Sequence, residues 1–140
     1  MRLLARRHQM PARLAAGAYL FNSGLTKHRA DEKTAAGVHG MAVGTYPFFQ
    51  DVDPETFTKL LGRAEMAVGA ALMLPIIPSV LAGAALAGFS GGLVGLYLRT
   101  PGMRRQGSLM PTPEGIGLAK DIWLFGIGAS LVAEELARDS

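Results

Sequence analysis

The sequence contains no cysteine, and this absence excludes disulfides, thiolate nucleophiles, iron–sulfur clusters and cysteine-ligated zinc. Charge is also scarce: Asp, Glu, Lys and Arg make up 18% of the residues, against about 25% in typical soluble domains. The 14 Lys and Arg residues are scattered between apolar runs and do not form a stripe with stacking aromatic residues. We therefore expect no nucleic-acid partner, although the net charge is +3.

Hydrophobic residues and glycine are abundant instead. The hydrophobic fraction is 49%, and the 18 glycines stand among Ala, Leu and Val, as in closely packed helices rather than flexible linkers. A length of 140 residues is that of one domain, which we place at 1–140. The composition therefore predicts a single membrane domain.

The longest uncharged run, 66–98, is too long for one membrane span. As a single helix it would measure roughly 50 Å, whereas the hydrocarbon core of a bilayer is about 30 Å thick. Pro75 and Pro78 divide the run, because each proline removes a backbone donor and restricts the residue before it. We expect two antiparallel helices here.

Helix start signals precede two of the predicted helices. Asp53, Pro54 and Glu55 supply an N-cap, a proline at the first helical position and an acid in the first turn, and Thr112 begins a second copy of this pattern. We predict an all-α fold, an integral membrane four-helix bundle, with helices at about 11–26, 54–74, 79–98 and 113–137. The outer two helices have shorter uncharged stretches, so a soluble helical bundle with one exposed hairpin is the alternative.

The N-terminus starts with basic residues and continues into an apolar stretch, as a signal peptide does. The stretch runs into Lys27, His28 and Arg29, where a cleavage site would need small residues, so we interpret it as an uncleaved first helix. Four spans place both termini on one side of the membrane. The arginines that precede the first helix favour the cytoplasmic side for both.

The segment 26–53, between the first two helices, is polar at first and then apolar. Its Tyr and Phe residues suit a membrane interface, so we predict a partly apolar interfacial loop that contains a short re-entrant or surface helix. His28 and His39 lack a partner at metal-ligand spacing and are interpreted as polar interface residues. No metal site is predicted.

Seven glycines are predicted to pack helix against helix. They recur mainly at intervals of four or seven, so that those of one helix share a face on which a backbone can approach closely. They are Gly17, Gly24, Gly62, Gly69, Gly88, Gly92 and Gly95. No predicted strand precedes them and no nucleotide-loop lysine follows, so we do not interpret them as phosphate-binding.

Five charged residues within or beside the predicted helices form the candidate site: Arg13, Lys27, Glu65, Lys120 and Asp121. Glu65 lies about three turns into its helix, where an ionised carboxylate needs a cation, and Lys120 is the predicted partner because its helix enters from the same side. We expect Arg13 and Lys27 to extend toward opposite interfaces, while Lys27 or Asp121 could complete the cluster. A structural polar cluster and a proton, quinone or anion site both stay open. No catalytic residue is predicted.

Three segments combine such charges with Gly, Ala and Leu: RLAAGAYLFNSGLTK, GRAEMAVGAALMLP and GLAKDIWLFGIG. They resemble the DoxX-like family of small four-helix bacterial membrane proteins, and the likeness covers about 11–135. The resemblance implies an inner-membrane protein associated with respiratory or thiol redox systems, such as a terminal quinol oxidase. Cysteine-dependent chemistry cannot extend to this chain, which has no cysteine.

We therefore expect a non-enzymatic accessory subunit of a respiratory or quinone-linked membrane redox complex. Its expected partners are the lipid bilayer and other membrane subunits, and it could form a homo-oligomer. No cofactor is expected to be covalently bound; a quinone could bind to Glu65 and Lys120, beside Trp123 and Phe125. The alternatives are a small proton-coupled transporter or permease, with Glu65 as its titrating group, and a scaffold that tethers partners through its loops.

Overall fold

The computed structural model describes residues 4–99, 110 and 120–139, and every regular element in this part of the chain is helical. The elements are the 3₁₀ helix η1 (Arg7–Gln9), α1 (Met10–His28), α2 (Glu32–Thr45), the 3₁₀ helix η2 (Pro47–Phe49), α3 (Pro54–Met73), α4 (Ser79–Arg99) and α6 (Asp121–Asp139). The all-α prediction is confirmed for these residues. The first turns predicted for the last helix, with the start signal at Thr112, lie outside the described residues.

The helix boundaries follow signals in the sequence. Asp53 caps α3, since its side chain accepts a hydrogen bond from the Thr56 backbone N–H at 3.0 Å. α3 ends shortly before Pro75, which cannot donate to the helix. Asp31 caps α2 by accepting from the Thr34 N–H at 2.8 Å, and this hydrogen bond lowers the pKa of Asp31. The helix predicted within the segment 26–53 is therefore present, as α2.

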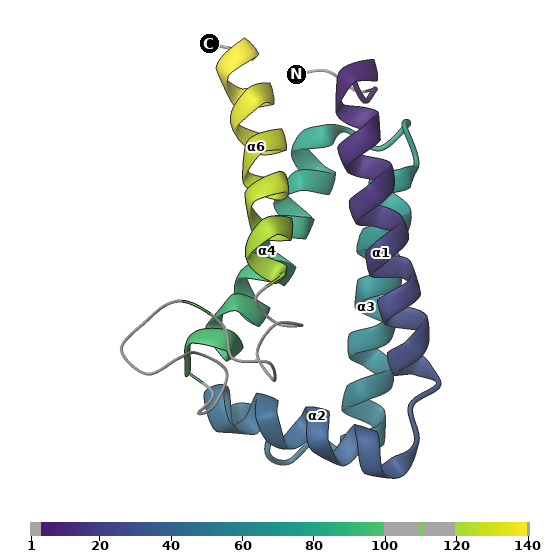
Figure 1. Cartoon of the computed structure of the whole chain (residues 1–140), viewed down its shortest axis with the longest axis vertical. Coiled ribbons are helices and arrows are strands. Elements are labelled where there is room, and N and C mark those ends of the chain that lie inside the picture. The colour runs from purple at the N-terminus through teal and green to yellow at the C-terminus, as the bar shows by residue number, and fades with distance from the viewer. Residues whose placement is uncertain (1–3, 100–109, 111–119, 140) are drawn as a thin grey trace.

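The four long helices of the described chain form two antiparallel pairs (Figure 1). α1 runs along α3, and α4 runs along α6. Both termini lie at the same end of the molecule, whereas α2 lies across the opposite end and contacts α3 and α4. Because the long helices alternate in direction, the chain ends where it started (Figure 1).

Glycines bring the backbones of α1 and α3 into contact. A Cβ atom added to Gly17 would meet the Gly69 carbonyl oxygen at 2.7 Å, and one added to Gly62 would meet the Gly24 carbonyl oxygen at 2.5 Å. A larger residue at any of these four positions would force the helices apart. The structure thus places four of the predicted packing glycines between these two helices.

α4 and α6 meet at a pair of glycines that the sequence analysis missed. A Cβ atom on Gly83 would lie 2.8 Å from the Gly128 carbonyl oxygen. The packing role predicted for Gly88 is wrong, because this residue is exposed and no described atom lies within 4 Å of its Cβ position. Gly92 and Gly95 approach a tyrosine hydroxyl near α2 rather than a helix backbone. The face of α4 that contains Gly83, not Gly88, is the one that turns toward α6.

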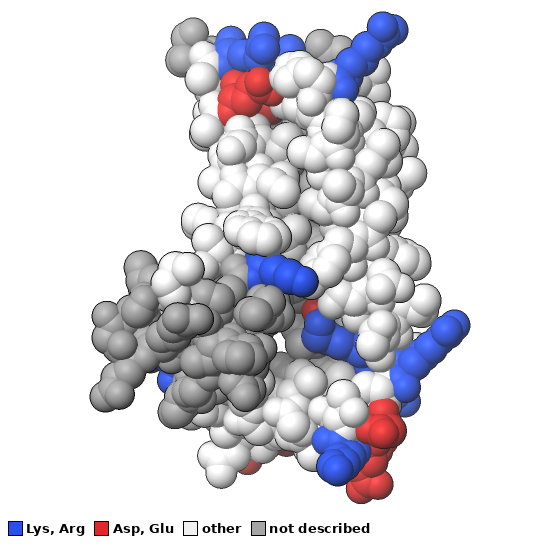
Figure 2. Space-filling view, viewed as in Figure 1, with Lys and Arg blue, Asp and Glu red and all other residues white. Residues whose placement is uncertain are grey.

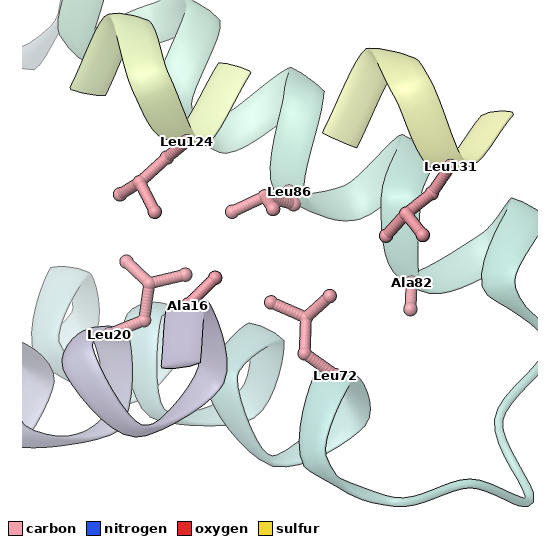
Figure 3. Close-up of a cluster of buried hydrophobic side chains, with 7 residues drawn as sticks. All are labelled: Ala16, Leu20, Leu72, Ala82, Leu86, Leu124 and Leu131. Carbon is pink, nitrogen blue, oxygen red and sulfur yellow. The ribbon is translucent and has the colours of Figure 1, made fainter. Parts of the chain in front are cut away.

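A small apolar core joins the two helix pairs (Figure 3). Its side chains point toward one another from both pairs. They are Ala16, Leu20 and Leu72 from the first pair and Ala82, Leu86, Leu124 and Leu131 from the second.

Many other large apolar side chains are exposed, while several of the largest buried side chains are polar. The exposed set includes Leu14, Phe21, Leu60, Ile76, Leu81, Trp123 and Leu136. The fully buried set includes Arg13, Glu65, Glu135, Thr58, Ser79 and Ser90. Charged side chains on the visible surface gather mainly toward the two ends of the molecule (Figure 2). The usual distribution of a water-soluble domain is therefore partly reversed.

α4 is long and apolar enough to cross a membrane, over Ser79–Leu96, as judged by length and composition. No other helix in the described part of the chain meets the same criterion. By this criterion the described part of the chain contains one possible membrane-spanning helix, against the four spans predicted from the sequence.

Candidate functional site

A cavity of about 830 Å³ lies between α1, α2, α3 and α4, at the end of the molecule where α2 crosses. This volume falls in the range of small-molecule sites, about 300–1,000 Å³. The walls are mostly apolar, with side chains such as Leu20, Val38, Met41, Phe57, Leu61, Phe89 and Leu93. The polar side chains of the lining are Tyr19, Ser23, Lys27, Thr34, Tyr46, Glu65 and Asp121.

Glu65 and Lys27 form an ion pair in this lining. Lys27 Nζ lies 2.5 Å from Glu65 Oε1, and Glu65 is only 1% exposed. Each residue comes one turn after a glycine of the α1–α3 contact, at Gly24 and Gly62. The close approach of the two backbones therefore brings the ammonium and carboxylate groups within reach of each other.

The predicted pairing of Glu65 with Lys120 is wrong. Lys120 is exposed and does not line the cavity. Lys27, which the sequence analysis allowed only as an additional member of the cluster, is the partner instead. The rotation of each helix about its own axis decides which lysine faces Glu65, and helix packing sets that rotation.

The Glu65 carboxylate has few donors around it. The ammonium of Lys27 donates a hydrogen bond to Ser23 Oγ at 3.0 Å. Neither Glu65 oxygen accepts a well-formed hydrogen bond from the described residues, although both oxygens are buried. Buried carboxylates normally accept several hydrogen bonds, so the charge of Lys27 is the main compensation that the described chain provides.

Asp121 brings a second carboxyl group to the same cavity. It is the first residue of α6, is 8% exposed, and is close enough to Glu65 and Lys27 to interact with both electrostatically. Asp121 therefore belongs to the cluster, as the sequence analysis allowed. The described lining thus contains two carboxyl groups and one ammonium group.

Aromatic residues form the wall of the cavity next to α2. The rings of Phe48 and Phe49 lie 4.4 Å apart, and the ring of Phe49 lies 4.9 Å from that of Phe57, measured between centroids. Tyr46 donates a hydrogen bond to the Gly92 carbonyl oxygen at 2.7 Å, which attaches the η2 segment to α4.

The aromatic neighbours predicted for a ligand, Trp123 and Phe125, do not line the cavity, and Trp123 is 69% exposed. The sequence analysis assigned the aromatic residues around 46–49 to an interfacial loop and so missed their role in the wall. One available signal was the helical spacing of Val38, Met41 and Ala42, which all line the cavity from α2.

Arg13 lies at the far end of the α1–α3 pair and does not extend to the membrane interface as predicted. Its side chain is fully buried. All five guanidinium N–H groups find acceptors: Nε donates to Leu72 O at 2.7 Å, Nη1 to Ile77 O at 3.0 Å and Ser79 Oγ at 2.8 Å, and Nη2 to Ala71 O at 2.8 Å and Leu74 O at 3.0 Å. Arg13 therefore caps the C-terminus of α3, where prolines leave carbonyls without backbone donors.

The same end of the molecule contains a polar network that joins the N-terminal segment to α6. Ser79, which accepts from Arg13, donates to Gln9 Oε1 at 2.6 Å. The Gln9 amide donates to Glu135 Oε1 at 3.3 Å, and Arg6 donates to both Glu135 oxygens at 3.0 and 2.9 Å. These bonds tie the start of α1 to the end of α6.

His39, in α2, has structural surroundings. His39 Nε2 lies 2.8 Å from the Phe49 carbonyl oxygen, to which it can donate, and its ring packs edge-on against Phe57. Among the residues that the structure describes, no group of three or more potential metal ligands comes together.

The five charged residues of the predicted site thus separate into three places. Lys27, Glu65 and Asp121 share the cavity, Arg13 caps α3, and Lys120 is exposed. Comparison of the chain with protein-family models, with curated proteins and with solved structures finds no match.

Proposed function

We propose that the chain is a multi-pass integral membrane protein of the DoxX-like type and serves as an accessory subunit of a membrane redox complex. The observation that carries the proposal is the reversed distribution of side chains. Large apolar residues face outward along the long helices, and the charged residues Arg13, Glu65 and Asp121 are buried. In lipid this distribution is favourable, because apolar side chains need no burial there and charges must turn inward.

The lengths of the helices support four spans. α1, α3, α4 and α6 contain 19, 20, 21 and 19 residues. At about 1.5 Å per residue they measure roughly 28–32 Å, close to the hydrocarbon thickness of about 30 Å. Charged residues lower the mean hydropathy of three of these helices, but Arg13, Glu65 and Asp121 would not meet lipid because they are buried. α2 then lies along one interface, and both termini lie on the cytoplasmic side of a bacterial inner membrane.

Single introduced cysteines test the topology without background, because the chain has none of its own. We expect Arg7→Cys and Glu32→Cys to react with a membrane-impermeant maleimide from opposite sides of a sealed vesicle. Gly88→Cys, exposed near the middle of α4, should be protected by lipid and react only after solubilisation. Labelling of all three positions from one side would refute the four-span arrangement.

Partner proteins test the accessory role. Purification from native membranes in a mild detergent, followed by mass spectrometry, should yield stoichiometric oxidase or dehydrogenase subunits. A homo-oligomer without companions would contradict the accessory role.

A quinone is the occupant of the cavity that the DoxX-like resemblance suggests. The apolar walls suit its ring and tail, and Lys27 and Tyr19 offer donors to its carbonyl oxygens. Quinol-dependent respiration should then fall when Glu65 is replaced by Gln. Unchanged respiration and unchanged assembly in this variant would remove the link to quinone.

A small proton-coupled transporter is the second candidate, and the two buried acids favour it. Glu65 and Asp121 line a cavity between helices, as titrating groups of transporters do. Flux through proteoliposomes that is lost in Glu65→Gln would support this function. Equal flux in the variant and the wild type would exclude Glu65 as the titrating group.

A further inference from the structure

In the described lining of the cavity, acidic side chains outnumber basic ones, and the accessory role does not explain this. Its described lining contains the carboxyl groups of Glu65 and Asp121 but only one cationic side chain, Lys27. Lys27 pairs with Glu65, which leaves Asp121 without a counter-charge of its own in the described lining. Beside apolar walls an uncompensated carboxylate is costly, so a ligand that carries a positive charge would be bound favourably there.

Glu65 gives a second and independent indication. Its side chain is fully buried, it lines the cavity, and its described compensation is the ion pair with Lys27, without a well-formed hydrogen bond to either oxygen. The closest approach of Lys27 is to Oε1, and no described residue donates a hydrogen bond to Oε2. A buried acceptor of this kind has capacity for a cation or a donor supplied by a ligand.

The rest of the wall suits a bulky apolar body. Tyr46, Phe49 and Phe57 lie on one side of the cavity, and their ring faces can attract a cation as well as bury hydrocarbon. The volume of about 830 Å³ accommodates a molecule of drug size.

We propose that this cavity is a binding site for hydrophobic organic cations, with Glu65 and Asp121 as its anionic groups and the α2-side aromatic residues as its apolar wall. A quinone is neutral and would add no cation beside the second carboxyl group. A hydrophobic anion would meet two carboxyl groups and one ammonium group. The inference concerns the cavity alone and does not depend on which proteins accompany the chain.

Two probes of the same shape and opposite charge test the proposal directly. Purified protein in a non-ionic detergent is dialysed to equilibrium against radiolabelled tetraphenylphosphonium or tetraphenylborate, with empty micelles as the blank. We expect saturable binding of the phosphonium cation at about one per chain and no binding of the borate anion above the blank. Equal binding of both probes would show that the cavity selects only for hydrophobicity and would overturn the proposal.

Variants locate the site. Glu65→Gln and Asp121→Asn preserve size and should each weaken binding of tetraphenylphosphonium by about tenfold, as expected for loss of one charged partner. Glu55→Gln is the matched control, because Glu55 is an exposed acid on the same helix as Glu65 and does not line the cavity. This variant should bind within about twofold of the wild type. Wild-type affinity in both cavity variants would overturn the assignment.

Binding of decylubiquinone, a neutral quinone, tests the competing assignment of the cavity. If the wild-type protein binds this neutral quinone but not tetraphenylphosphonium, the cation site is refuted and the quinone assignment is strengthened. The comparison between the two tetraphenyl probes needs only the wild-type chain, so it stays decisive even if a variant does not fold.

Discussion

Replacing Arg13 by methionine should strongly destabilise the fold, although Arg13 is far from the cavity. Its guanidinium supplies donors to the end of α3 that the backbone cannot supply. In a continuous helix the N–H of residue 75 would bond to the carbonyl of Ala71, and that of residue 78 to Leu74, but both donor positions are proline. The two Nη2 hydrogens of Arg13 bond to these two carbonyls instead.

The size of the effect follows from the acceptors that would be left. Leu74 keeps a bond from the Ile77 N–H, but Ala71, Leu72 and Ile77 would lose the arginine donors of their carbonyls. Each buried carbonyl left without a donor costs about 1–3 kcal/mol. Part of this cost is offset, because the Arg13→Met variant has no guanidinium to desolvate on folding. We expect a net loss of about 3 kcal/mol in the free energy of unfolding. Arg13→Lys should lose about half as much, because an ammonium has three donors against five.

The assay is reversible unfolding of the purified protein in mixed micelles with increasing denaturing detergent, followed by circular dichroism. Arg7→Met is the matched control, since Arg7 is exposed, and it should change stability by less than about 0.5 kcal/mol. Pro75→Ala adds an independent test, because alanine restores the donor for the Ala71 carbonyl. Pro75→Ala should therefore change the free energy of unfolding more favourably in the Arg13→Met variant than in the wild type, by at least about 0.5 kcal/mol. Equal stabilities of Arg13→Met and Arg7→Met would refute the capping argument.

Three further predictions concern helix packing, the ion pair and the attachment of α2. Gly62→Ala should lower stability by about 2 kcal/mol, because its Cβ would lie 2.5 Å from an α1 carbonyl oxygen, whereas Gly88→Ala should be neutral or stabilising. Lys27→Met should lower the free energy of unfolding by about 2 kcal/mol, because it leaves the buried Glu65 carboxylate without its cation, whereas Lys120→Met should lower it by less than about 0.5 kcal/mol. The same unfolding assay measures these four glycine and lysine variants. Equal effects of the two lysine substitutions would contradict the pairing of Lys27 with Glu65. Tyr46→Phe should lower the free energy of unfolding by about 1 kcal/mol, because it removes a hydrogen bond to the α4 backbone. It should also speed hydrogen exchange of the backbone amides in α2. Unchanged exchange in α2 would show that this bond does not attach the helix.

The cavity shows how far residue types alone could lead. Glu65 is an acid within an otherwise apolar helix, so its need for a cation could be inferred from sequence. Two lysines could satisfy that need, and the choice of Lys27 over Lys120 depends on how α1 and α6 are rotated against α3. The aromatic wall depends on the path of the chain after α2, for which no local pattern was decisive.

Arg13 illustrates a different kind of failure. An arginine near the end of an apolar helix is a good candidate for an interfacial anchor, and the sequence analysis interpreted it so. The acceptors that hold Arg13 inside the protein are backbone carbonyls at 71–77, about sixty residues further along the chain. Backbone acceptors have no signature in a sequence, and only the antiparallel packing of α1 and α3 brings them to this side chain.

The sequence by itself determined the helical class, the break at Pro75 and Pro78, the cap at Asp53 and the α1–α3 glycines. These features depend on local backbone chemistry or on a repeat along one helix, both of which can be read from neighbouring residues. Only the tertiary structure decided the partner of Glu65, the cap on α3, the Gly83–Gly128 contact and the cavity. Each of these is set by the rotation and offset of one helix against another, which result from the packing of the whole chain.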